Sequence, residues 1–345
     1  MQSVKSMETT VTLEQLWTAF VAGERDFSGI DLSHVDLSHW SLAKVDLWGG
    51  NFVQANLTKV SLKRATLKEA QFTGATLTEA DLRWADLRGA VLVDADLTGA
   101  RLDGALYDQE TLFPPGFDPV TAKMWHLVPG VNLATKDLRD RDLSGIDLTQ
   151  ADLSGALMVE CHLFGITLNR ANLLSVLLAN SDLRYADLRS ATLMLADLRG
   201  ANLSHSDLRR ANLIGANLRD CQLDDVQLDG ALYSDNTRFP QGFSIPPGLY
   251  RLAPGADLWG ADLSGARLTG INLQSANLSG ANLSYADFWG ACLADADLMG
   301  ANLLGTNLLG TDLTGANLNQ TNLMQAVIDL PADMMLTNQL NGQPA

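Results

Sequence analysis

Histidine serves both acid–base catalysis near neutral pH and metal binding, so the five histidines are the first candidates for chemistry. His34 and His39 lie five residues apart, at equivalent outward positions of the repeat described below. No cysteine or carboxylate stands at a spacing that would complete a metal site with them. We therefore predict that the histidines are solvated or structural, and we predict no metal site; the other three are His126, His162 and His205.

The three cysteines are the next candidate nucleophiles. Cys161 and Cys221 fall at an inward position of the repeat, where a small apolar thiol fits. The predicted distance of about 14 Å between them is too long for a disulfide. Cys292 is expected to face outward, but no base lies near it in the sequence to activate the thiol.

Motifs for catalysis and cofactor binding are missing from the sequence. It has no P-loop, no glycine-rich dinucleotide fingerprint opening a helix, no His-Glu-x-x-His pair and no nucleophile elbow. The glycine- and aspartate-rich repeat of calcium-binding β-helices is also absent. We therefore predict a protein that is not an enzyme, with no catalytic residues, no cofactor and no metal.

Composition narrows the classes of partner. Forty acidic residues against 24 basic ones give the 345-residue chain a net charge of −16. This balance argues against direct nucleic-acid binding and against a polybasic membrane-surface protein. No apolar run reaches the ~18 residues of a membrane span, and no apolar signal core follows Met1, so we expect a soluble, cytoplasmic protein without membrane insertion.

A five-residue repeat dominates the sequence. An apolar residue recurs at every fifth position from Phe27 to Leu102, from Leu133 to Leu228 and from Leu258 to Ile328. Nearly all of these central residues are leucine. Two positions before each one stands a small residue, usually alanine, and Asp or Asn commonly lies between the two.

This period fits neither regular secondary structure. A step of five residues turns an α-helix by about 140°, which would spread the leucines over every face. On a continuous strand an odd step alternates between the two faces. The chain must therefore turn once per repeat so that every leucine returns to the inside, and the frequent Gly, Asp, Asn and Ser supply suitable turn residues.

The Ala-(Asp/Asn)-Leu-x-x pattern resembles that of the pentapeptide-repeat proteins. The resemblance implies an all-β solenoid: a right-handed quadrilateral β-helix in which four repeats form one coil. Phe52 and Phe72, 20 residues apart, agree with a four-sided coil. Two stretches that interrupt the rhythm share the pattern Phe-Pro-x-Gly-Phe and look like loops of cyanobacterial members of the family. We expect their aromatic residues to pack on the flank of the solenoid; docking of a partner is the alternative.

The ends and interruptions divide the chain. Thr12 and Gln15 have capping-box spacing ahead of a short amphipathic helix that Gly23 closes, so a helix is expected to cover the first coil, where Trp40 fills an otherwise small position. Lys136 and Arg141 fall at inward positions, which predicts an irregular coil or a new start at 131–141. The predicted parts are an N-terminal tail and capping helix (1–24), a first repeat block (25–107), an inserted loop (108–130), a second block (131–233), a second loop (234–255), a third block (256–328) and a C-terminal cap and tail (329–345).

Apolar residues at outward positions are the strongest functional signal. In the second block one set follows the central leucines at intervals of 20, and another replaces the usual Asp or Asn on the neighbouring face. Such a cluster marks a contact with a protein partner or a second copy of the chain, unless a loop of the same chain covers it or it has no role. The candidate contact residues are Leu157, Leu174, Leu177, Met194, Leu195 and Ile214.

The sequence thus favours a non-enzymatic protein-interaction scaffold on a rigid acidic solenoid, with an unidentified protein partner or self-association. The alternative follows from the family resemblance: a DNA-mimicking decoy that binds a topoisomerase or another DNA-binding protein. Duplex DNA carries about one charge per 1.7 Å, far more than a net −16 spread over this chain provides. In the second block, Arg184, Arg189, Arg199 and Arg209 alternate with aspartates, which predicts a self-neutralising surface.

Overall fold

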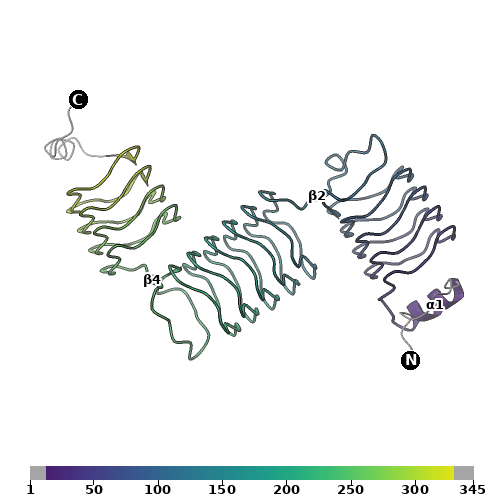
Figure 1. Cartoon of the computed structure of the whole chain (residues 1–345), viewed down its shortest axis with the longest axis horizontal. Helices are drawn as coiled ribbons and strands as arrows, with labels where there is room; N and C mark the ends of the chain where they lie inside the picture. Colours follow the sequence, from purple (N-terminus) through teal and green to yellow (C-terminus); the bar gives the residue numbers. More distant parts are fainter. Residues whose placement is uncertain (1–12, 330–345) are drawn as a thin grey trace. The chain divides into compact units, whose positions relative to one another are not determined.

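The computed structural model describes residues 13–329 and divides the chain into two compact units, Met1–Val128 and Pro129–Ala345. Each unit is a stack of coils joined by parallel β-bridges (Figure 1). The bridges pair residues 20 apart, as in Asp26↔Asp46 and Asn132↔Asp152. Four five-residue repeats therefore make one coil, and both units are β-helical solenoids, as the five-residue period predicted.

The corner of each repeat explains the sequence pattern. Positions are numbered here from the central leucine. The residue at +2 has φ near +60°, whether it is a glycine or another residue such as His34. The Asp or Asn at −1 accepts a hydrogen bond from the backbone N–H at +1, as Asp31 does from Ser33 at 3.0 Å. This side chain stabilises the turn locally, which is why Asp and Asn recur at −1.

The core of each coil consists of the central residues and those at −2. Most central leucines are almost completely buried, and Phe52 and Phe72 stack at 4.9 Å between ring centroids, which agrees with a coil of 20 residues. A few −2 positions hold hydroxyl residues instead of alanine. Ser181 donates a hydrogen bond to the Met158 carbonyl at 2.6 Å, so the buried hydroxyl group is satisfied.

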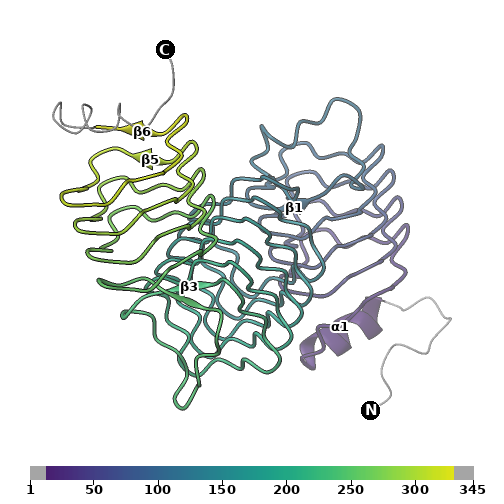
Figure 2. The ribbon, with the colours of Figure 1, turned by 60° about the vertical axis from the view of Figure 1, so that its left-hand side comes forward.

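A helix, α1 (Leu13–Val21), caps the first coil (Figure 2). Leu16 is buried in the core of the first block, and Trp17 meets Trp40 edge to face at 5.4 Å. Gly23, with φ of 98°, ends the helix as predicted, with a bond from the Glu24 N–H to the Ala19 carbonyl. The expected N-cap, Thr12, lies outside the described residues, and within them no helix is long and apolar enough to cross a membrane.

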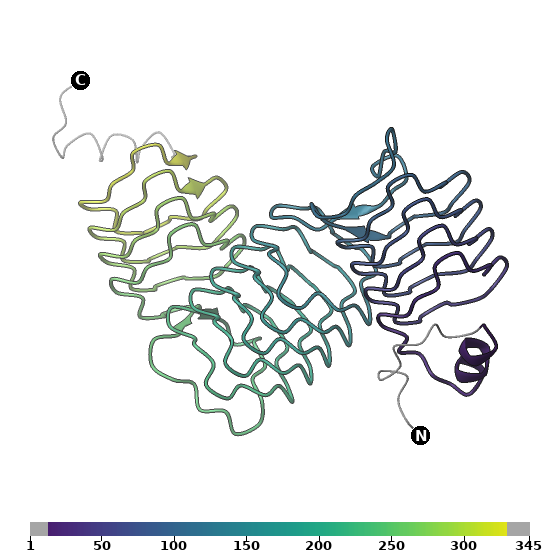
Figure 3. The same cartoon turned by 45° about the vertical axis from the view of Figure 1, so that its right-hand side comes forward.

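Two loops leave the stack and rejoin it one coil later (Figure 3). β1 (Leu106–Tyr107) pairs in parallel with β2 (Trp125–His126), and β3 (Leu232–Tyr233) pairs with β4 (Tyr250–Arg251). In the first loop Tyr107, Phe113 and Phe117 pack against the core of the first unit, which is the flank packing that the sequence predicted. A last pair of strands joins β5 (Asn307–Leu308) to β6 (Val327–Ile328).

The stretch 131–141 is regular, so the irregular-coil alternative was wrong and the new-start alternative holds. Asn132 and Asp137 bridge to Asp152 and Leu157 in the standard register, and the second unit begins at Pro129. Lys136 and Arg141 are half-buried at −2, in the first coil of the second unit. Most of the predicted C-terminal cap, residues 330–345, lies outside the described residues.

Candidate functional site

Three of the six candidate contact residues, Leu174, Met194 and Ile214, form one outward column of the second unit. The Ser175 N–H donates to the Met194 carbonyl at 2.8 Å, and the Leu195 N–H donates to the Ile214 carbonyl at 3.0 Å. These bonds place Leu174, Met194 and Ile214 at the same +1 position of successive coils. At a coil spacing of about 4.8 Å, the column spans about 10 Å.

The other three residues lie around the adjoining corner. Leu157 bridges to Leu177 one coil later, on the next face of the solenoid, and Leu195 stands at the corner between the two faces. Leu195 is 61% exposed and Leu177 is 37% exposed, whereas Leu157, Leu174 and Met194 are half-buried. We call these five residues the apolar corner.

Polar pairs frame the apolar corner on the Leu157–Leu177 face. Above and below these two leucines, Arg139 pairs with Asp137 at 2.8 Å and Arg199 pairs with Asp197 at 2.6 Å. Between these pairs the +1 positions hold Val159 and Ala179, both half-buried. Our sequence reasoning missed these two residues because it searched for large apolar side chains. An apolar centre with a polar rim is the anatomy of protein–protein contact surfaces.

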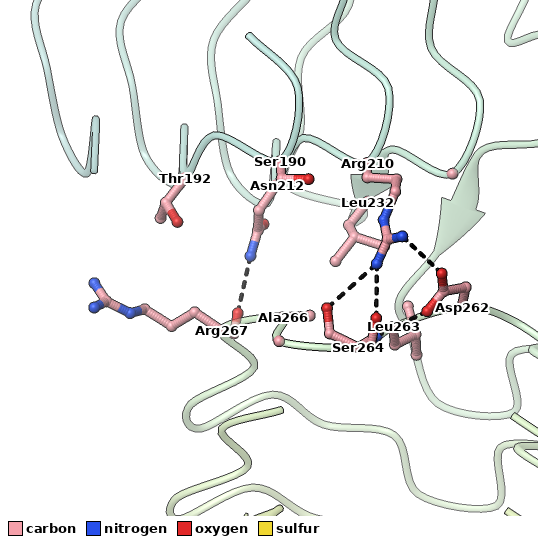
Figure 4. Close-up of a pocket in the computed structure, with 12 residues that line it drawn as sticks. Ser190, Thr192, Arg210, Asn212, Leu232, Asp262, Leu263, Ser264, Ala266 and Arg267 are labelled. Carbon is pink, nitrogen blue, oxygen red and sulfur yellow. Dashed lines mark hydrogen bonds and ion pairs between the residues drawn. The ribbon is translucent and has the colours of Figure 1, made fainter. Parts of the chain in front are cut away.

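Ile214 differs from the others because the same chain partly covers it. It packs against the core cluster that contains the third block. Beside it, Asn212 donates to the Arg267 carbonyl at 2.8 Å, and Arg210 forms an ion pair with Asp262 at 2.7 Å (Figure 4). These contacts hold the third block against the second block within the second unit.

The family model described as pentapeptide repeats matches more than half of the chain, at residues 41–78, 75–105, 156–194, 196–232, 255–290 and 291–328. The chain belongs to the pentapeptide-repeat family. No curated protein matches this pentapeptide-repeat protein. The family assignment therefore rests on the repeats themselves.

Several solved structures are similar to parts of this pentapeptide-repeat protein. Rfr23 from the cyanobacterium Cyanothece 51142 is 31% identical over 32% of this chain and 88% of its own, with a TM-score of 0.32. HetL from Nostoc sp. strain PCC 7120, described as involved in heterocyst differentiation regulation, is 26% identical over 92% and 97%, with a TM-score of 0.22. QnrB1, a plasmid-mediated fluoroquinolone resistance protein, is 13% identical over 85% and 100%, with a TM-score of 0.25.

In the second block of this pentapeptide-repeat protein, the arginines of the Asp-Leu-Arg sequences pair with aspartates, as predicted. In each such repeat the arginine at +1 turns back to the aspartate at −1 of the same repeat, as Arg189 does to Asp187 at 2.6 Å. The hydrogen bond from Arg189 holds the pKa of Asp187 below its usual range. The same arrangement occurs at Arg184, Arg199 and Arg209.

The predicted positions of the cysteines are confirmed, and the histidines reveal one missed feature. Cys161 and Cys221 are buried at −2, and burial raises the pKa of each thiol to about 12, which leaves both unreactive. His205 stacks on Tyr185 at 4.8 Å, and Tyr185 in turn contacts Phe164 at 5.2 Å. The signal for this aromatic stack was the near-20-residue spacing of its members. Within residues 13–329 no cluster of three potential metal ligands occurs.

Two hollows of the second unit are poorly suited to bind a ligand, one because of its size and the other because of its charge. The cavity of about 50 Å³ beside Arg210 and Asp262 holds water at most, because ligand pockets measure roughly 300–1,000 Å³. An open depression of about 330 Å³ is lined by Arg170, Arg189, Arg209 and Arg210. Three of these four arginines already pair with aspartates, and Asp229 also lines the depression, so little uncompensated charge remains for an anion.

Proposed function

We propose that this pentapeptide-repeat protein is a non-enzymatic scaffold that binds another protein through the apolar corner of its second unit. The observation that carries the proposal is the exposure of Leu195 and Leu177 between the Asp137–Arg139 and Asp197–Arg199 pairs. Contiguous patches of exposed apolar side chains mark contact surfaces, whereas single exposed ones do not, and the apolar corner gathers five apolar residues. The partner is a second, unidentified protein of the cytoplasm.

The proposed architecture suits this role. A right-handed quadrilateral β-helix with inserted loops at 108–130 and 234–255 fixes each outward side chain on a coil held by backbone bonds on both sides. Little conformational entropy is then lost when a partner binds. Residues of the outward columns can also be substituted without changing the buried Leu and Ala core, so binding can change while the stability of the fold is kept.

Replacement of Met194 by glutamate tests the proposal. A charge in the centre of the apolar corner must be desolvated in the complex, so retention of the partner should fall at least about tenfold. Thermal unfolding should remain within a few degrees of the unchanged protein, because Met194 is outside the core. The measurement is affinity capture from the native host with quantitative mass spectrometry, alongside melting curves.

A matched control adds the same charge outside the apolar corner. Thr149 stands at the same +1 position of a different face, and Thr149→Glu should leave partner retention unchanged. Equal retention by Met194→Glu and the unchanged protein would count against the apolar corner. Sedimentation velocity of the purified chain distinguishes a second copy from a different protein as the occupant.

The decoy alternative has less support. The aspartates of the Asp-Leu-Arg repeats are bound by arginines of the same repeat, so they do not form the uncompensated row of charge that mimicry of DNA requires. We expect no inhibition of gyrase supercoiling by the purified protein at physiological salt. Inhibition at equimolar concentrations would favour the decoy instead.

A further inference from the structure

The first unit carries a face whose charge is opposite to that of the whole chain. Backbone bonds join the +2 and +1 positions of successive coils there: the Lys44 N–H donates to the Lys63 carbonyl, and the Arg64 N–H to the Arg83 carbonyl. The ladder continues from Trp84 to Asp103 and from Gly104 to Lys123. We call this surface the basic face; it comprises Lys44, Lys63, Arg64, Asp81, Arg83, Trp84, Arg101, Asp103 and Lys123.

Charge on the basic face is only partly compensated. It has six basic and two acidic side chains, within a protein of net charge −16. Asp81 pairs with Arg83 at 2.5 Å, and Asp103 lies 3.9 Å from Lys123. Among the described residues no carboxylate forms an ion pair with Lys44, Lys63 or Arg101. Lys44 and Arg101 are exposed, so their charges are available to a partner, and Lys123 is exposed beside Asp103.

Trp84 provides an aromatic centre for this surface. The Lys63 ammonium lies 4.8 Å from its ring centroid and the Arg83 guanidinium 5.5 Å, both within cation–π range. The ring lies over Gly104, one coil later, and a Cβ added there would stand 2.6 Å from Trp84 Cδ1. The first inserted loop adds Lys123, and its Trp125 ring also approaches Gly104, with Cζ2 3.2 Å from the same added Cβ. The loop therefore helps to build the basic face.

We propose that the basic face binds an acidic polypeptide segment, rich in aspartate and glutamate, with Trp84 at the centre of the contact. Tryptophan and arginine are the residue types that most often dominate protein contacts. About four coils at ~4.8 Å make the face roughly 15–20 Å high, which suits a short extended segment. A long nucleic acid carries about one charge per 1.7 Å and would extend onto the acidic remainder of the protein. This surface is separate from the apolar corner and does not depend on it.

The test uses fluorescence anisotropy of a fluorescein-labelled peptide of about ten glutamates, with a glutamine peptide and a single-stranded oligonucleotide of similar length as comparison probes. The full chain should bind the glutamate peptide at low salt, and about 0.5 M salt should weaken binding strongly. The double variant Lys44→Glu, Arg101→Glu should reduce affinity at least about tenfold, because two exposed charges are reversed. Circular dichroism checks that this variant remains folded.

The matched control reverses two exposed arginines of the second unit, Arg170→Glu and Arg219→Glu, which changes the net charge by the same amount. It should bind the glutamate peptide within about twofold of the unchanged protein, as should Met194→Glu. Equal losses in the two double variants would show a non-specific charge effect and overturn the proposal. Failure to bind the glutamate peptide at low salt, equal binding of the glutamine peptide, or tighter binding of the oligonucleotide would also overturn it.

Discussion

At the scale of single residues, the +2 position links backbone strain to surface chemistry. Its left-handed conformation favours glycine, yet Trp84, Leu195 and Tyr285 occupy it with φ near +58°. Each of these large side chains lies over a glycine at the +2 position of the next coil, as Leu195 does over Gly215. Because glycine has no Cβ, it leaves room for the large side chain of the preceding coil.

Gly104→Ala tests this pairing. A methyl group at residue 104 would meet Trp84, so the variant should lose about 1–3 kcal/mol of stability beyond the strain of a left-handed alanine. Gly49→Ala is the control, because Gly49 has a similar φ of +64° and nothing within 4 Å of the added atom. Urea unfolding of both variants measures the difference. Equal losses would mean that Trp84 does not pack on Gly104.

Only some of these residue positions were predictable from the sequence. The repeat placed Cys161 inside and Met194 outside, because both follow directly from the five-residue phase; the corner position of the adjoining Leu195 came from the structure. The stacking of Trp84 on Gly104 needed the 20-residue register as well, since the two residues are far apart along the chain. Val159 and Ala179 were missed because neither side chain is large. They matter because the same +1 position holds an arginine, Arg139 or Arg199, in the coils on either side.

At the scale of elements, side-chain ladders reinforce the stacked coils. In the third block, Asn282 donates to Asp262 and Asn302 donates to Asn282, each at 3.2 Å, and Asn322 continues the row at 3.1 Å. The same amides also accept bonds from the +1 backbone N–H groups, so each asparagine joins a turn to the next coil. This double role explains why asparagine can replace aspartate at −1.

Asn302→Asp should break this ladder. The new carboxylate retains the turn bond but cannot donate, and it faces the side-chain oxygen of Asn282, so stability should fall by about 1–2 kcal/mol. Asn319→Asp adds the same charge in the same block at an exposed +1 position and should change stability by less than about 0.5 kcal/mol. Denaturant melts compare them. A loss at residue 302 no larger than at residue 319 would contradict the ladder's contribution.

The inserted loops show where element prediction from the sequence ends. The helix at Leu13–Val21 and its termination at Gly23 were predictable because local spacing and capping specify them. The return of the first loop through Trp125 to pair with Leu106 was not, because no periodicity connects the two segments. Aromatic residues alone indicated packing but did not specify the register.

At the scale of the whole molecule, opposite charges are segregated although the net charge is strongly negative. Net charge argued against direct nucleic-acid binding and a polybasic membrane-surface protein. It gave no sign of the basic face, because folding brings Lys44, Lys63 and Arg101 together from three coils. The aspartates elsewhere are mostly engaged in turns and arginine pairs. These bonds also determine how stability responds to acid.

Stability should be insensitive to pH from 7 to about 5 and should fall below about pH 4. The bonds from Arg83 and Arg189 hold the pKa values of Asp81 and Asp187 below the unfolded value of about 3.9. A lowered folded pKa stabilises the protein above the unfolded pKa, and this contribution is lost as the pH falls through the folded pKa. Melting temperatures across this pH range provide the measurement. A marked fall between pH 7 and 5 would show that other groups control acid stability.

The most direct measurement of the protein-binding role is site-specific photo-crosslinking in the native host. A benzophenone amino acid placed at Leu195 should yield a discrete crosslinked protein band, because this side chain is the most exposed member of the apolar corner. The same amino acid at Arg170, an exposed +2 residue at a different corner, should yield none. Crosslinks of equal strength at both positions, or none at Leu195, would contradict the account.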